Sequence, residues 1–552
     1  MSVLRASIGA FRRQVALATL CFCGHQVGEA LVPVLVGVVI DVALRGGDGV
    51  ALLGWLAVLG LDFAFLSTCY RLGARQAWIA DVRADQRLRL LVARRLLDPA
   101  GGAEAGRLPG GLVAVATSDT KRVGLVNFAL PLGLAAVASL VVAAVALLRI
   151  SVPLGLLILL GTPPVLFLIY LFGRPLERRS EAEQEQAAHA AGTAADLIAG
   201  IRVLKGLRAE PAAVRRYTRA SEDSLGATLR ATRSQAWFSG TVLIVNGTFL
   251  ALIALVGGRL AAEGAISLGG LVAAVGLAQF LVDPLQELGW VNERLAQARA
   301  SARRIADLLA AAPAVRSGTQ PLPARVDGAL RVRGPLDLDV RPGEFLGVVT
   351  ADPADAVTLL RSLARETDAE DVTVALDGAP LEDYPPEQAR SAVLVAAHDA
   401  QLFADTVHRI AAAGAPAGHD LAPALAAARA DQVIETLPDG ADTRITEQGR
   451  SLSGGQRQRV ALARALAADA PVLVLHDPTT AVDSVTEAEI ASRLRTLRHG
   501  RTTVVVTSSP ALLAVTDRVV LVDRGVAEGG VTDGRHDLLL RENPRYREVV
   551  RG

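Results

Sequence analysis

Apolar residues form long stretches in the first 310 residues of the chain, and polar segments separate these stretches. A helix needs roughly 20 apolar residues to cross a membrane, and most of the stretches reach or approach that length. The pattern predicts an all-α transmembrane domain over residues 1–310, with six spans and both of its ends on one side of the membrane. The stretches are Val15–Leu44, Val50–Leu66, Val123–Leu148, Val152–Phe172, Trp237–Val256 and Leu268–Leu281.

Basic residues are distributed unevenly among the segments that connect these spans. Arg71–Arg122 holds ten Arg or Lys, and Arg174–Arg233 holds eleven. The short alternate connections hold only Arg45, Arg149 and Arg259. Because connections rich in Lys and Arg stay on the cytoplasmic side, the two long segments are predicted to be cytoplasmic. We therefore expect a multi-pass protein of the cytoplasmic (inner) membrane, with the second half of the chain in the cytoplasm.

Amphipathic segments extend the predicted spans beyond the membrane. Val82–Leu97 and Glu177–Leu197 keep apolar residues at helical spacing among charged residues, so both are expected to be cytoplasmic helices. The turns that follow, near Gly106–Asp119 and Gly206–Tyr217, contain glycine and proline breaks. Each turn suits a short transverse helix.

The pattern changes after residue 310. Proline, glycine and serine without helical periodicity predict a linker over residues 311–328. Short β-branched stretches with helical segments between them follow, and they predict an α/β domain over residues 329–552. The expected strands are Phe345–Val349, Val393–Val395, Val472–Leu475, Thr503–Thr507 and Val519–Val522.

Composition agrees with a membrane protein, since 51% of the residues are hydrophobic and only 20% are charged. The net charge of +1 gives no electrostatic basis for a nucleic-acid partner. Cys21, Cys23 and Cys69 all fall in or beside predicted spans. Their expected role is that of small apolar side chains in the membrane, rather than a disulfide framework or a metal site.

The chemistry of the second half centres on Leu452–Asp483. The run Leu-Ser-Gly-Gly at 452–455 places a hydroxyl and backbone N–H groups at the start of a helix, where a phosphate group is attracted. A buried parallel strand follows and ends in His476 and Asp477. Ligands of open α/β sheets lie at that end of the strands, so this stretch predicts a phosphate-binding region.

LSGGQRQR, followed by a strand and then by DPTTAVD, resembles the signature helix, Walker B strand and D-loop of ABC transporter ATPases. The predicted spans resemble the six-helix transmembrane domain of exporter-type members. In that family two ATPase domains stack head to tail, and ATP with Mg²⁺ lies between the phosphate loop of one domain and the signature of the other. The resemblance implies ATP and Mg²⁺ at sites shared with a partner. The implied contact residues are Ser453, Gly454, Gly455 and Gln456 in the signature and Asp483 in the D-loop.

The phosphate loop of this family has the motif G-x-x-x-x-G-K-[ST], with glycines for close backbone approach and a lysine on the phosphate oxygens. The matching window reads TADPADAVTLL, and lysine occurs in the chain only at positions 121 and 205. Pro353 is expected to remove an N–H donor, and Asp355 to add negative charge where the triphosphate would lie. The loop is therefore predicted to be degenerate. Its residues are Thr350, Pro353, Asp355, Ala356 at the lysine position, Val357 and Thr358.

The other catalytic positions that the resemblance implies are altered as well. His476 stands where the family has an aspartate associated with magnesium, and imidazole suits that oxygen-seeking ion poorly. Asp477 replaces the glutamate that polarises the attacking water, and its side chain is shorter by about 1.5 Å. His398 and Ser508 occupy the positions of the Q-loop glutamine and the switch histidine. A metal or hydrolase cluster of these histidines with Asp477 is the competing interpretation, but no third ligand motif accompanies it.

These features predict the degenerate, non-catalytic subunit of a heterodimeric ABC exporter. The partner would be a consensus-type half-transporter in the same lipid membrane, and ATP would be hydrolysed where its Walker motifs meet this chain's signature. The chain alone is then expected to be inactive. Two alternatives stay open: an importer with the exporter fold, as in some siderophore systems, and a membrane regulator that transports nothing. The transported molecule is expected to be a small molecule or a peptide.

Polar side chains inside the spans are candidates for a substrate cavity. His25 and Glu29 share one face of the first span, while Asp62 and Asp283 lie in spans two and six. Charges in a membrane are costly and usually face a cavity or a partner. Pairing within or between subunits is the favoured interpretation, and recognition of a cationic or peptide-like substrate is the alternative.

Overall fold

The computed structural model describes residues 2–44, 49–334, 337–368, 372–398, 401–523 and 531–551. The chain forms two compact units. One contains the residues up to Val92 together with Val113–Asp307, and the other contains Ala93–Leu112 with the residues from Leu308 onward. The first cytoplasmic turn of the chain thus belongs to the second unit.

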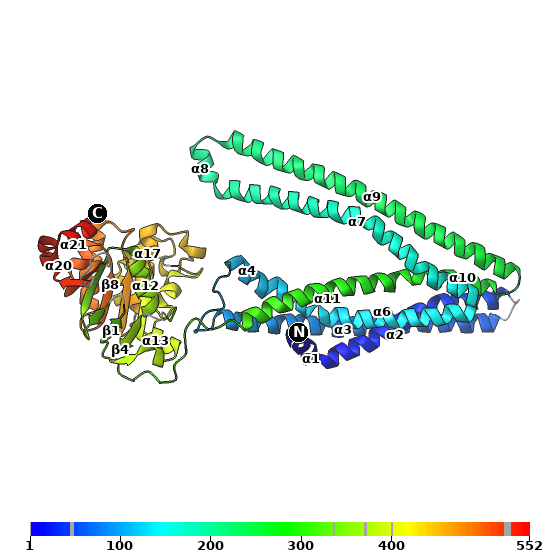
Figure 1. Cartoon of the computed structure of the whole chain (residues 1–552), viewed down its shortest axis with the longest axis horizontal. Helices are drawn as coiled ribbons and strands as arrows, with labels where there is room; N and C mark the ends of the chain where they lie inside the picture. The colour runs from blue at the N-terminus through cyan, green and yellow to red at the C-terminus, as the bar shows by residue number, and fades with distance from the viewer. Residues whose placement is uncertain are drawn as a thin grey trace. The chain divides into compact units, whose positions relative to one another are not determined.

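The first unit is all-α, as the apolar pattern predicts (Figure 1). Among the described residues, six helical segments are long and apolar enough to cross a membrane, which confirms the six-span prediction. The segments are Arg12–Ala43, Gly49–Leu96, Pro109–Ile150, Val152–Ala199, Glu210–Ala262 and Leu268–Leu309. The helices up to residue 309 are α1 (Ser2–Ala10), α2 (Arg12–Leu44), α3 (Gly49–Leu96), α4 (Pro109–Ala114), the π-helix η1 (Val115–Asp119), α5 (Thr120–Gly124), α6 (Val126–Ile150), α7 (Val152–Ala199), α8 (Ile201–Gly206), α9 (Glu210–Ala262), α10 (Leu268–Phe280) and α11 (Val282–Leu309).

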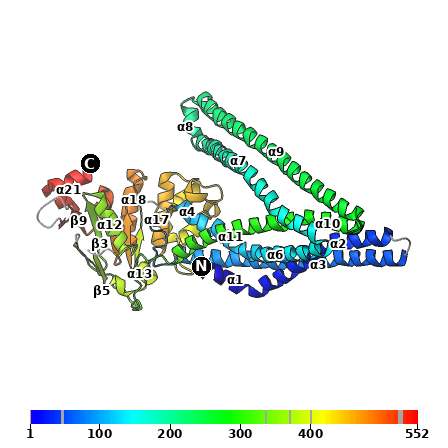
Figure 2. The same cartoon turned by 45° about the vertical axis from the view of Figure 1, so that its right-hand side comes forward.

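Helices α7 and α9 run side by side as a hairpin that α8 joins, as the views in Figures 1 and 2 show. The short helix α8 lies ahead of the turn predicted near Gly206–Tyr217, because α9 already begins at Glu210. Pro211 in the first turn of α9 suits this start, since proline needs no N–H partner there. The membrane ends of the hairpin pack with α6 and α10 in one apolar cluster that includes Ile158 and Ile253.

The second unit is an α/β domain, which confirms the predicted fold class. Its strands are β1 (Leu330–Arg333), β2 (Leu338–Val340), β3 (Phe345–Thr350), β4 (Thr373–Leu376), β5 (Ala379–Pro380), β6 (Val393–Ala396), β7 (Val472–His476), β8 (Thr502–Val506), β9 (Arg518–Val522) and β10 (Val531–Gly534). Its helices are α12 (Pro353–Leu363), η2 (Leu381–Asp383), α13 (Pro386–Ala392), α14 (Val407–Ala412), α15 (Ala422–Ala427), α16 (Ala430–Thr436), η3 (Gly440–Asp442), η4 (Glu447–Gly449), α17 (Gly454–Ala467), α18 (Ser484–Leu497), α19 (Pro510–Ala514), α20 (His536–Glu542) and α21 (Pro544–Arg551).

The main sheet has the strand order β10-β9-β3-β8-β7-β6. Its neighbouring strands are parallel except for β10, which pairs with β9 antiparallel. The five strands expected from the sequence are the parallel strands of this sheet. A second, antiparallel sheet has the order β2-β1-β4-β5. The sequence pattern does not predict it, because its strands are only two to four residues long.

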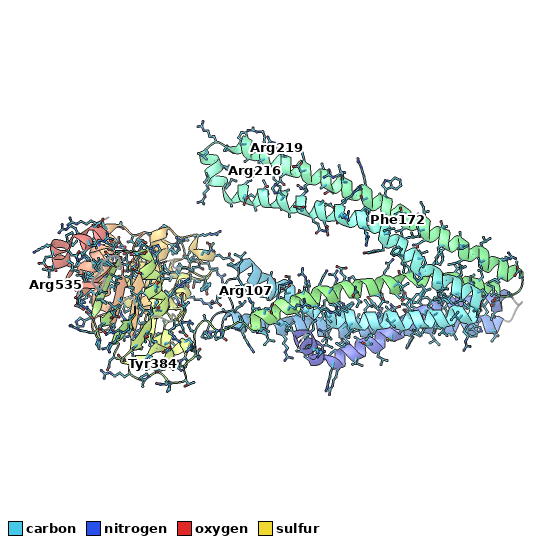
Figure 3. All side chains as sticks on the ribbon, in the orientation of Figure 1. Arg107, Phe172, Arg216, Arg219, Tyr384 and Arg535 are labelled. Carbon is cyan, nitrogen blue, oxygen red and sulfur yellow. The ribbon has the colours of Figure 1, made fainter. Side chains whose placement is uncertain are left out.

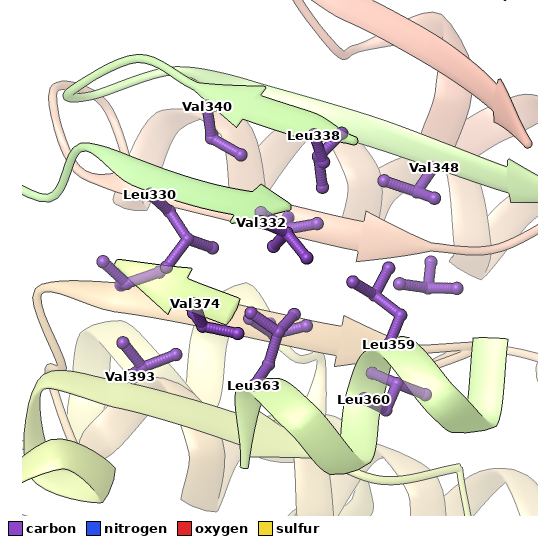
Figure 4. Packing of buried hydrophobic residues seen from close by; sticks show 14 of the residues in the cluster. Leu330, Val332, Leu338, Val340, Val348, Leu359, Leu360, Leu363, Val374 and Val393 are labelled. Atoms are coloured by element: carbon purple, nitrogen blue, oxygen red, sulfur yellow. The ribbon is translucent and has the colours of Figure 1, made fainter. Parts of the chain in front are cut away.

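A buried apolar cluster joins residues of both sheets with α12 (Figure 4). Leu330 and Val332 of β1, Val348 of β3, and Leu359 and Leu363 of α12 are each at most 2% exposed. Burying a leucine or valine side chain typically contributes about 1.5–3 kcal/mol. The cluster therefore fixes β3 and α12, the two elements between which a phosphate loop would lie.

The segment Ala93–Leu112 is attached to this unit through backbone carbonyl groups. Arg390 on α13 donates a hydrogen bond to the Pro99 carbonyl oxygen at 2.7 Å. The N–H of Ala314 donates to the Ala100 carbonyl oxygen at 2.9 Å. The turn that follows α3 is thus held by side-chain and backbone donors of the α/β unit.

Candidate nucleotide-binding site

The signature segment begins α17 with a complete capping box. The N–H of Gln456 donates to the Ser453 hydroxyl at 3.2 Å, and the N–H of Ser453 donates to the Gln456 side-chain oxygen at 2.9 Å. This reciprocal pair satisfies N–H groups that a helix start leaves without partners. The N–H groups of Gly454 and Gly455 stay outside the pair, at the end of the helix that attracts a phosphate group.

Gly455 has a structural role as well. A Cβ atom at this position would lie 2.6 Å from the Ala481 carbonyl oxygen, and one at Gly454 would lie 3.3 Å from the Ala481 side chain. The first distance is too short for a real contact, so α17 and the following loop can pack this closely only with glycine at 455. A substitution there would disturb this packing whether or not a nucleotide is bound.

The D-loop, which connects β7 to α18, is tied to α17. The side-chain amide of Gln458 donates to the Thr480 hydroxyl at 2.7 Å and accepts from the Ala481 N–H at 2.8 Å. Asp483 caps α18 by accepting a hydrogen bond from the Thr486 N–H at 3.0 Å. That hydrogen bond lowers the pKa of the Asp483 carboxyl group. Signature and D-loop therefore form one ordered surface.

The segment at the phosphate-loop position is shorter than the motif it replaces. Helix α12 begins at Pro353, so only Ala351 and Asp352 separate it from β3. The Asp352 carboxylate accepts a hydrogen bond from the Ala354 N–H at 2.8 Å and caps the helix. The chain's own carboxylate therefore occupies the helix start at which a phosphate would bind.

The expectation that Asp355 faces the triphosphate is wrong. Asp355 lies in the first turn of α12 and is 3% exposed, because the helix begins early and turns this side chain inward. The repelling charge at the helix start comes from Asp352 instead. Ala356, at the lysine position, is 4% exposed and belongs to the core. The Thr358 hydroxyl donates to a backbone carbonyl within α12 at 2.9 Å, so the helix itself uses this group.

The residues at this loop do not fit a nucleoside triphosphate with its Mg²⁺. Thr350 ends β3, and Val357 is exposed on α12, and neither supplies a lysine-like charge. The chain has no lysine beyond position 205 that could replace the missing one. The donor set of a phosphate loop is therefore incomplete at this position.

His476 and Asp477 lie next to each other at the carboxyl end of β7, with His476 Nε2 3.8 Å from the Asp477 carboxylate. The Thr507 hydroxyl donates to that carboxylate at 2.7 Å, and the backbone of Asp477 is left-handed with φ of 43°. Burial lowers the pKa of His476, so the imidazole is neutral at pH 7. A neutral imidazole beside a carboxylate that a threonine already occupies is a poor magnesium site.

The His398 ring lies 5.8 Å from the His476 ring, so the altered Q-loop and Walker B positions share one location. Both histidines line a pocket of about 460 Å³ together with Phe403 and Arg464. Ser508, at the switch position, is exposed. Within the described part of the chain, no group of three or more His, Cys, Asp or Glu side chains is placed to hold a metal ion.

The structure also brings together polar candidates of the transmembrane unit. His25 Nε2 lies 3.7 Å from the Glu29 carboxylate on α2. A Cβ atom at Gly28 would lie 3.2 Å from Asp62 Oδ1, so Asp62 on α3 approaches α2 closely. Asp283 lies in the first turn of α11.

Several residues of both sites were missed by sequence reasoning. Gln26 donates to the Glu287 carboxylate at 3.0 Å and links α2 to α11 across 261 positions, for which no local signal exists. The partners of Gln458 and the Thr507 contact with Asp477 are also set by the fold alone. Asp352 did carry a signal, because an aspartate directly before a proline commonly caps a helix.

Two family descriptions match the chain. The family described as ABC transporter transmembrane region matches residues 15–285, and the family described as ABC transporter matches residues 334–480. Together the matches cover more than half of the chain and include both the spanning helices and the signature.

Two curated relatives are about equally similar to this chain in sequence. A multidrug efflux ATP-binding/permease protein of Mycobacterium bovis is 32% identical over 403 residues, which are 70% of this chain and 34% of that protein. An ATP-dependent lipid A-core flippase of Desulfotalea psychrophila is 29% identical over 393 residues, which are 68% of each protein. The match thus spans about a third of the mycobacterial relative and about two thirds of the flippase.

A solved structure, a bacterial Atm1-family ABC exporter with ATP bound, superposes with a TM-score of 0.74. The superposition covers 98% of both chains at 23% sequence identity. At this identity the likeness shows the fold, which is six spanning helices followed by an α/β ATPase domain.

Proposed function

Because the chain belongs to the ABC transporter family, we propose that it is the non-catalytic half of a heterodimeric ABC exporter. It is a multi-pass protein of the bacterial inner membrane with its ATPase domain in the cytoplasm. Residues 1–310 supply half of the translocation pathway, residues 311–328 are the linker, and residues 329–552 are the ATPase domain. The signature of this domain completes an ATP site on a consensus-type half-transporter.

The observation that carries the proposal is a contrast between two helix starts of one domain. At α17, the capping box of Ser453 and Gln456 leaves the glycine N–H groups at the helix start outside its hydrogen bonds. At α12, Asp352 caps the helix start with its own carboxylate and Pro353 lacks an N–H donor. The start of α17 therefore suits the phosphates of a nucleotide that a partner domain holds. The start of α12 does not suit a nucleotide bound by this domain's own phosphate loop.

The signature residues have separate roles in this proposal. The Ser453 hydroxyl and the N–H groups of Gly454 and Gly455 contact the terminal phosphate of ATP that the partner's phosphate loop holds. Gln456 orients Ser453 through the capping box, and Asp483 orders the D-loop beside it. When bound, ATP would supply the phosphoryl group, and Mg²⁺ would neutralise part of the negative charge of its phosphates. At the second composite site the altered residues of this chain hold nucleotide weakly and without hydrolysis.

The α7–α9 hairpin supports pairing with a second half-transporter. Its cytoplasmic end exposes large apolar side chains, with Ile198 69%, Val203 64% and Leu207 72% exposed. Figure 3 shows Arg216 and Arg219 on α9 at the same end of the hairpin. Soluble surfaces of single chains rarely leave neighbouring apolar side chains this open, so a partner protein is the expected cover.

Export is the direction suggested by the names of the relatives, since one is a multidrug efflux protein and the other a flippase that acts on lipid A-core. Their names do not fix the molecule that this chain moves. An importer with this fold and a regulator that transports nothing would give different results in the following experiment.

The test is to purify the chain alone and with the partner that co-purifies, and to measure Mg²⁺-dependent ATPase activity and flux in vesicles of both orientations. The chain alone should show no activity above a vesicle blank, and the pair should drive outward flux. Robust turnover by the chain alone would overturn the proposal. Inward flux would identify an importer, and ATPase activity without flux would identify a regulator.

A further inference from the structure

The apolar stretches of the spanning helices carry acidic residues, of which Glu29 lies 3.7 Å from His25 Nε2. The six apolar stretches contain Glu29, Asp41 and Asp62 but neither Arg nor Lys. Asp283 and Glu287 follow the last stretch and precede the first basic residue of α11. Since a charge in a membrane is costly unless it is paired, the partners of these acids decide their role.

Asp41 and Glu287 differ in their surroundings. Asp41 accepts hydrogen bonds from the Ser267 hydroxyl at 2.5 Å and from the Gly269 N–H at 2.9 Å, so it has a structural role at the start of α10. Glu287 accepts a hydrogen bond from the Gln26 amide at 3.0 Å. This contact joins α2 to α11 and brings no positive charge.

The other acids gather around the contact between Gln26 and Glu287. Glu29 lies one turn after Gln26 on α2, and Asp283 lies one turn before Glu287 on α11. Both carboxylates interact electrostatically with Glu287. Asp62 on α3 approaches the same stretch of α2, because a Cβ atom on the glycine before Glu29 would lie 3.2 Å from its Oδ1. Carboxylates of α2 and α11 therefore converge at Glu287, whereas Asp62 lies on the Gly28 side of α2, about 200° around the helix from Gln26.

Two buried oxygens at this location have no hydrogen-bond partner within the described ranges. Gln26 is 4% exposed, and its side-chain oxygen is unpaired while its NH₂ group is bonded to Glu287. Asp62 Oδ2 is also buried and unpaired. Buried acceptors without donors are destabilising. A hydrogen-bond donor or a cation from outside the described chain would therefore stabilise both oxygens.

Aromatic rings lie beside His25, whose Nε2 is 3.7 Å from the Glu29 carboxylate. The Tyr70 ring lies 5.1 Å from the His25 ring and 6.1 Å from the Phe22 ring. The Phe128 ring lies 5.8 Å from Phe22 and 5.0 Å from Trp78. Aromatic residues make up only 4% of the chain, so the grouping is not a consequence of composition. Tyr70 is 50% exposed, which leaves its ring face open to a cation, whereas Trp78 lies about 12 Å further along α3 in the segment predicted to be cytoplasmic.

We propose that this acidic cluster, formed by Gln26, Glu29, Asp283 and Glu287, recognises a hydrophobic organic cation as the transported molecule. The carboxylates attract the charge, and the neighbouring rings contact the apolar substituents. The unpaired oxygen of Gln26 accepts a hydrogen bond where the cation carries an N–H group. The inference rests on the proposed transport function and names its substrate class.

A Lys or Arg from a partner chain is the competing counterion. That arrangement gives the open face of Tyr70 no role. It also makes the opposite prediction for stability, because removal of a paired carboxylate would leave the partner's cation buried and alone.

The test is equilibrium binding of tetraphenylphosphonium, a permanently charged hydrophobic cation, to the full chain purified in detergent with any partner that co-purifies. ATP is omitted, so the binding result does not depend on whether this chain is the non-catalytic half of a pair, which the ATPase assays test. Tetraphenylborate, an anion of the same shape, is the control ligand. We expect saturable binding of the cation and none of the anion.

Glu287→Gln and Glu29→Gln should each weaken cation binding about tenfold or more, since each removes a charge-assisted contact. Glu293→Gln neutralises an exposed carboxylate further along α11 and should leave binding unchanged. The first two variants should unfold at the same temperature as the wild type or a higher one. Absence of saturable binding, equal binding of the anion, unchanged binding in both variants, or lower stability of both would overturn the proposal.

Discussion

Gln458 on the signature helix holds the D-loop through Ala481, whose N–H donates to the Gln458 side-chain oxygen at 2.8 Å. The same amide donates to the Thr480 hydroxyl at 2.7 Å. Gly455 in turn packs so closely on the Ala481 carbonyl that a Cβ atom there would lie 2.6 Å from it. The signature and the D-loop thus position each other through a residue outside the motif's phosphate contacts.

Removal of the Gln458 side-chain amide should loosen the D-loop without unfolding the domain. Each hydrogen bond contributes about 0.5–1.5 kcal/mol, so the loss of both in Gln458→Ala should lower the ATPase rate of the co-purified pair about 5- to 150-fold. Gln432→Ala shortens an amide on α16 in the same domain and serves as the control. A wild-type rate in Gln458→Ala would show that turnover does not depend on the link.

Introduction of a lysine at the degenerate loop should not restore a phosphate-binding site there. Ala356 is 4% exposed within the core, so Ala356→Lys buries an ammonium group and should destabilise the chain by about 2 kcal/mol or more. Val357→Lys, at a neighbouring position that is 46% exposed, should leave the unfolding temperature nearly unchanged. Thermal unfolding and nucleotide stoichiometry check both variants. An Ala356→Lys chain of normal stability that gains a second turnover site would refute the geometry described for α12.

The stability of the ATPase domain should fall in mild acid. Burial lowers the pKa of His476 below its usual value of about 6.5, so the unfolded chain takes up a proton there more readily than the folded chain. Stability is therefore present above this value and is lost as the pH falls toward the folded pKa. Burial lowers the pKa of His536 as well, which adds a loss of the same sign.

The check is thermal unfolding of the full chain at pH 7.5 and pH 5.5. His476→Asn should lose less stability between the two conditions than the wild type does. His419→Asn, which replaces an exposed histidine, should behave as the wild type. An identical loss in the wild type and in His476→Asn would contradict the sign derived from burial.

Local patterns explain which parts of the fold could be predicted. The spans and the parallel strands are long apolar or β-branched runs, and such signals need no knowledge of the remaining chain. The helix start at Pro353 also carried a local signal in Asp352, whereas the burial of Asp355 and Ala356 follows only from the way α12 packs on the core. That start decides that Asp352, rather than Asp355, carries the charge at the phosphate position.

The candidate sites show the same division. Ser453 and the glycines after it were found from the motif, but the contact of Gly455 with Ala481 depends on a loop that returns to the helix. Gln26 and Glu287 are joined only by the packing of two spans. Residues whose partners lie far away in the sequence could not be paired from one sequence alone.

In the proposed function this chain acts through its signature and not through its own phosphate loop. Ser453→Ala removes the hydroxyl proposed to contact the partner's ATP, whereas His476→Ala alters only the second composite site. Thr406→Ala removes a comparable helix-capping hydroxyl from α14 and controls for the loss of a cap.

The most direct test is the steady-state Mg²⁺-dependent ATPase rate of the co-purified pair carrying each of these substitutions. Ser453→Ala should lower the rate about tenfold to a hundredfold, because a phosphate contact and a helix cap are lost together. His476→Ala should stay within about threefold of the wild type, and Thr406→Ala should match it. A near-normal rate in Ser453→Ala together with loss of turnover in His476→Ala would contradict the account.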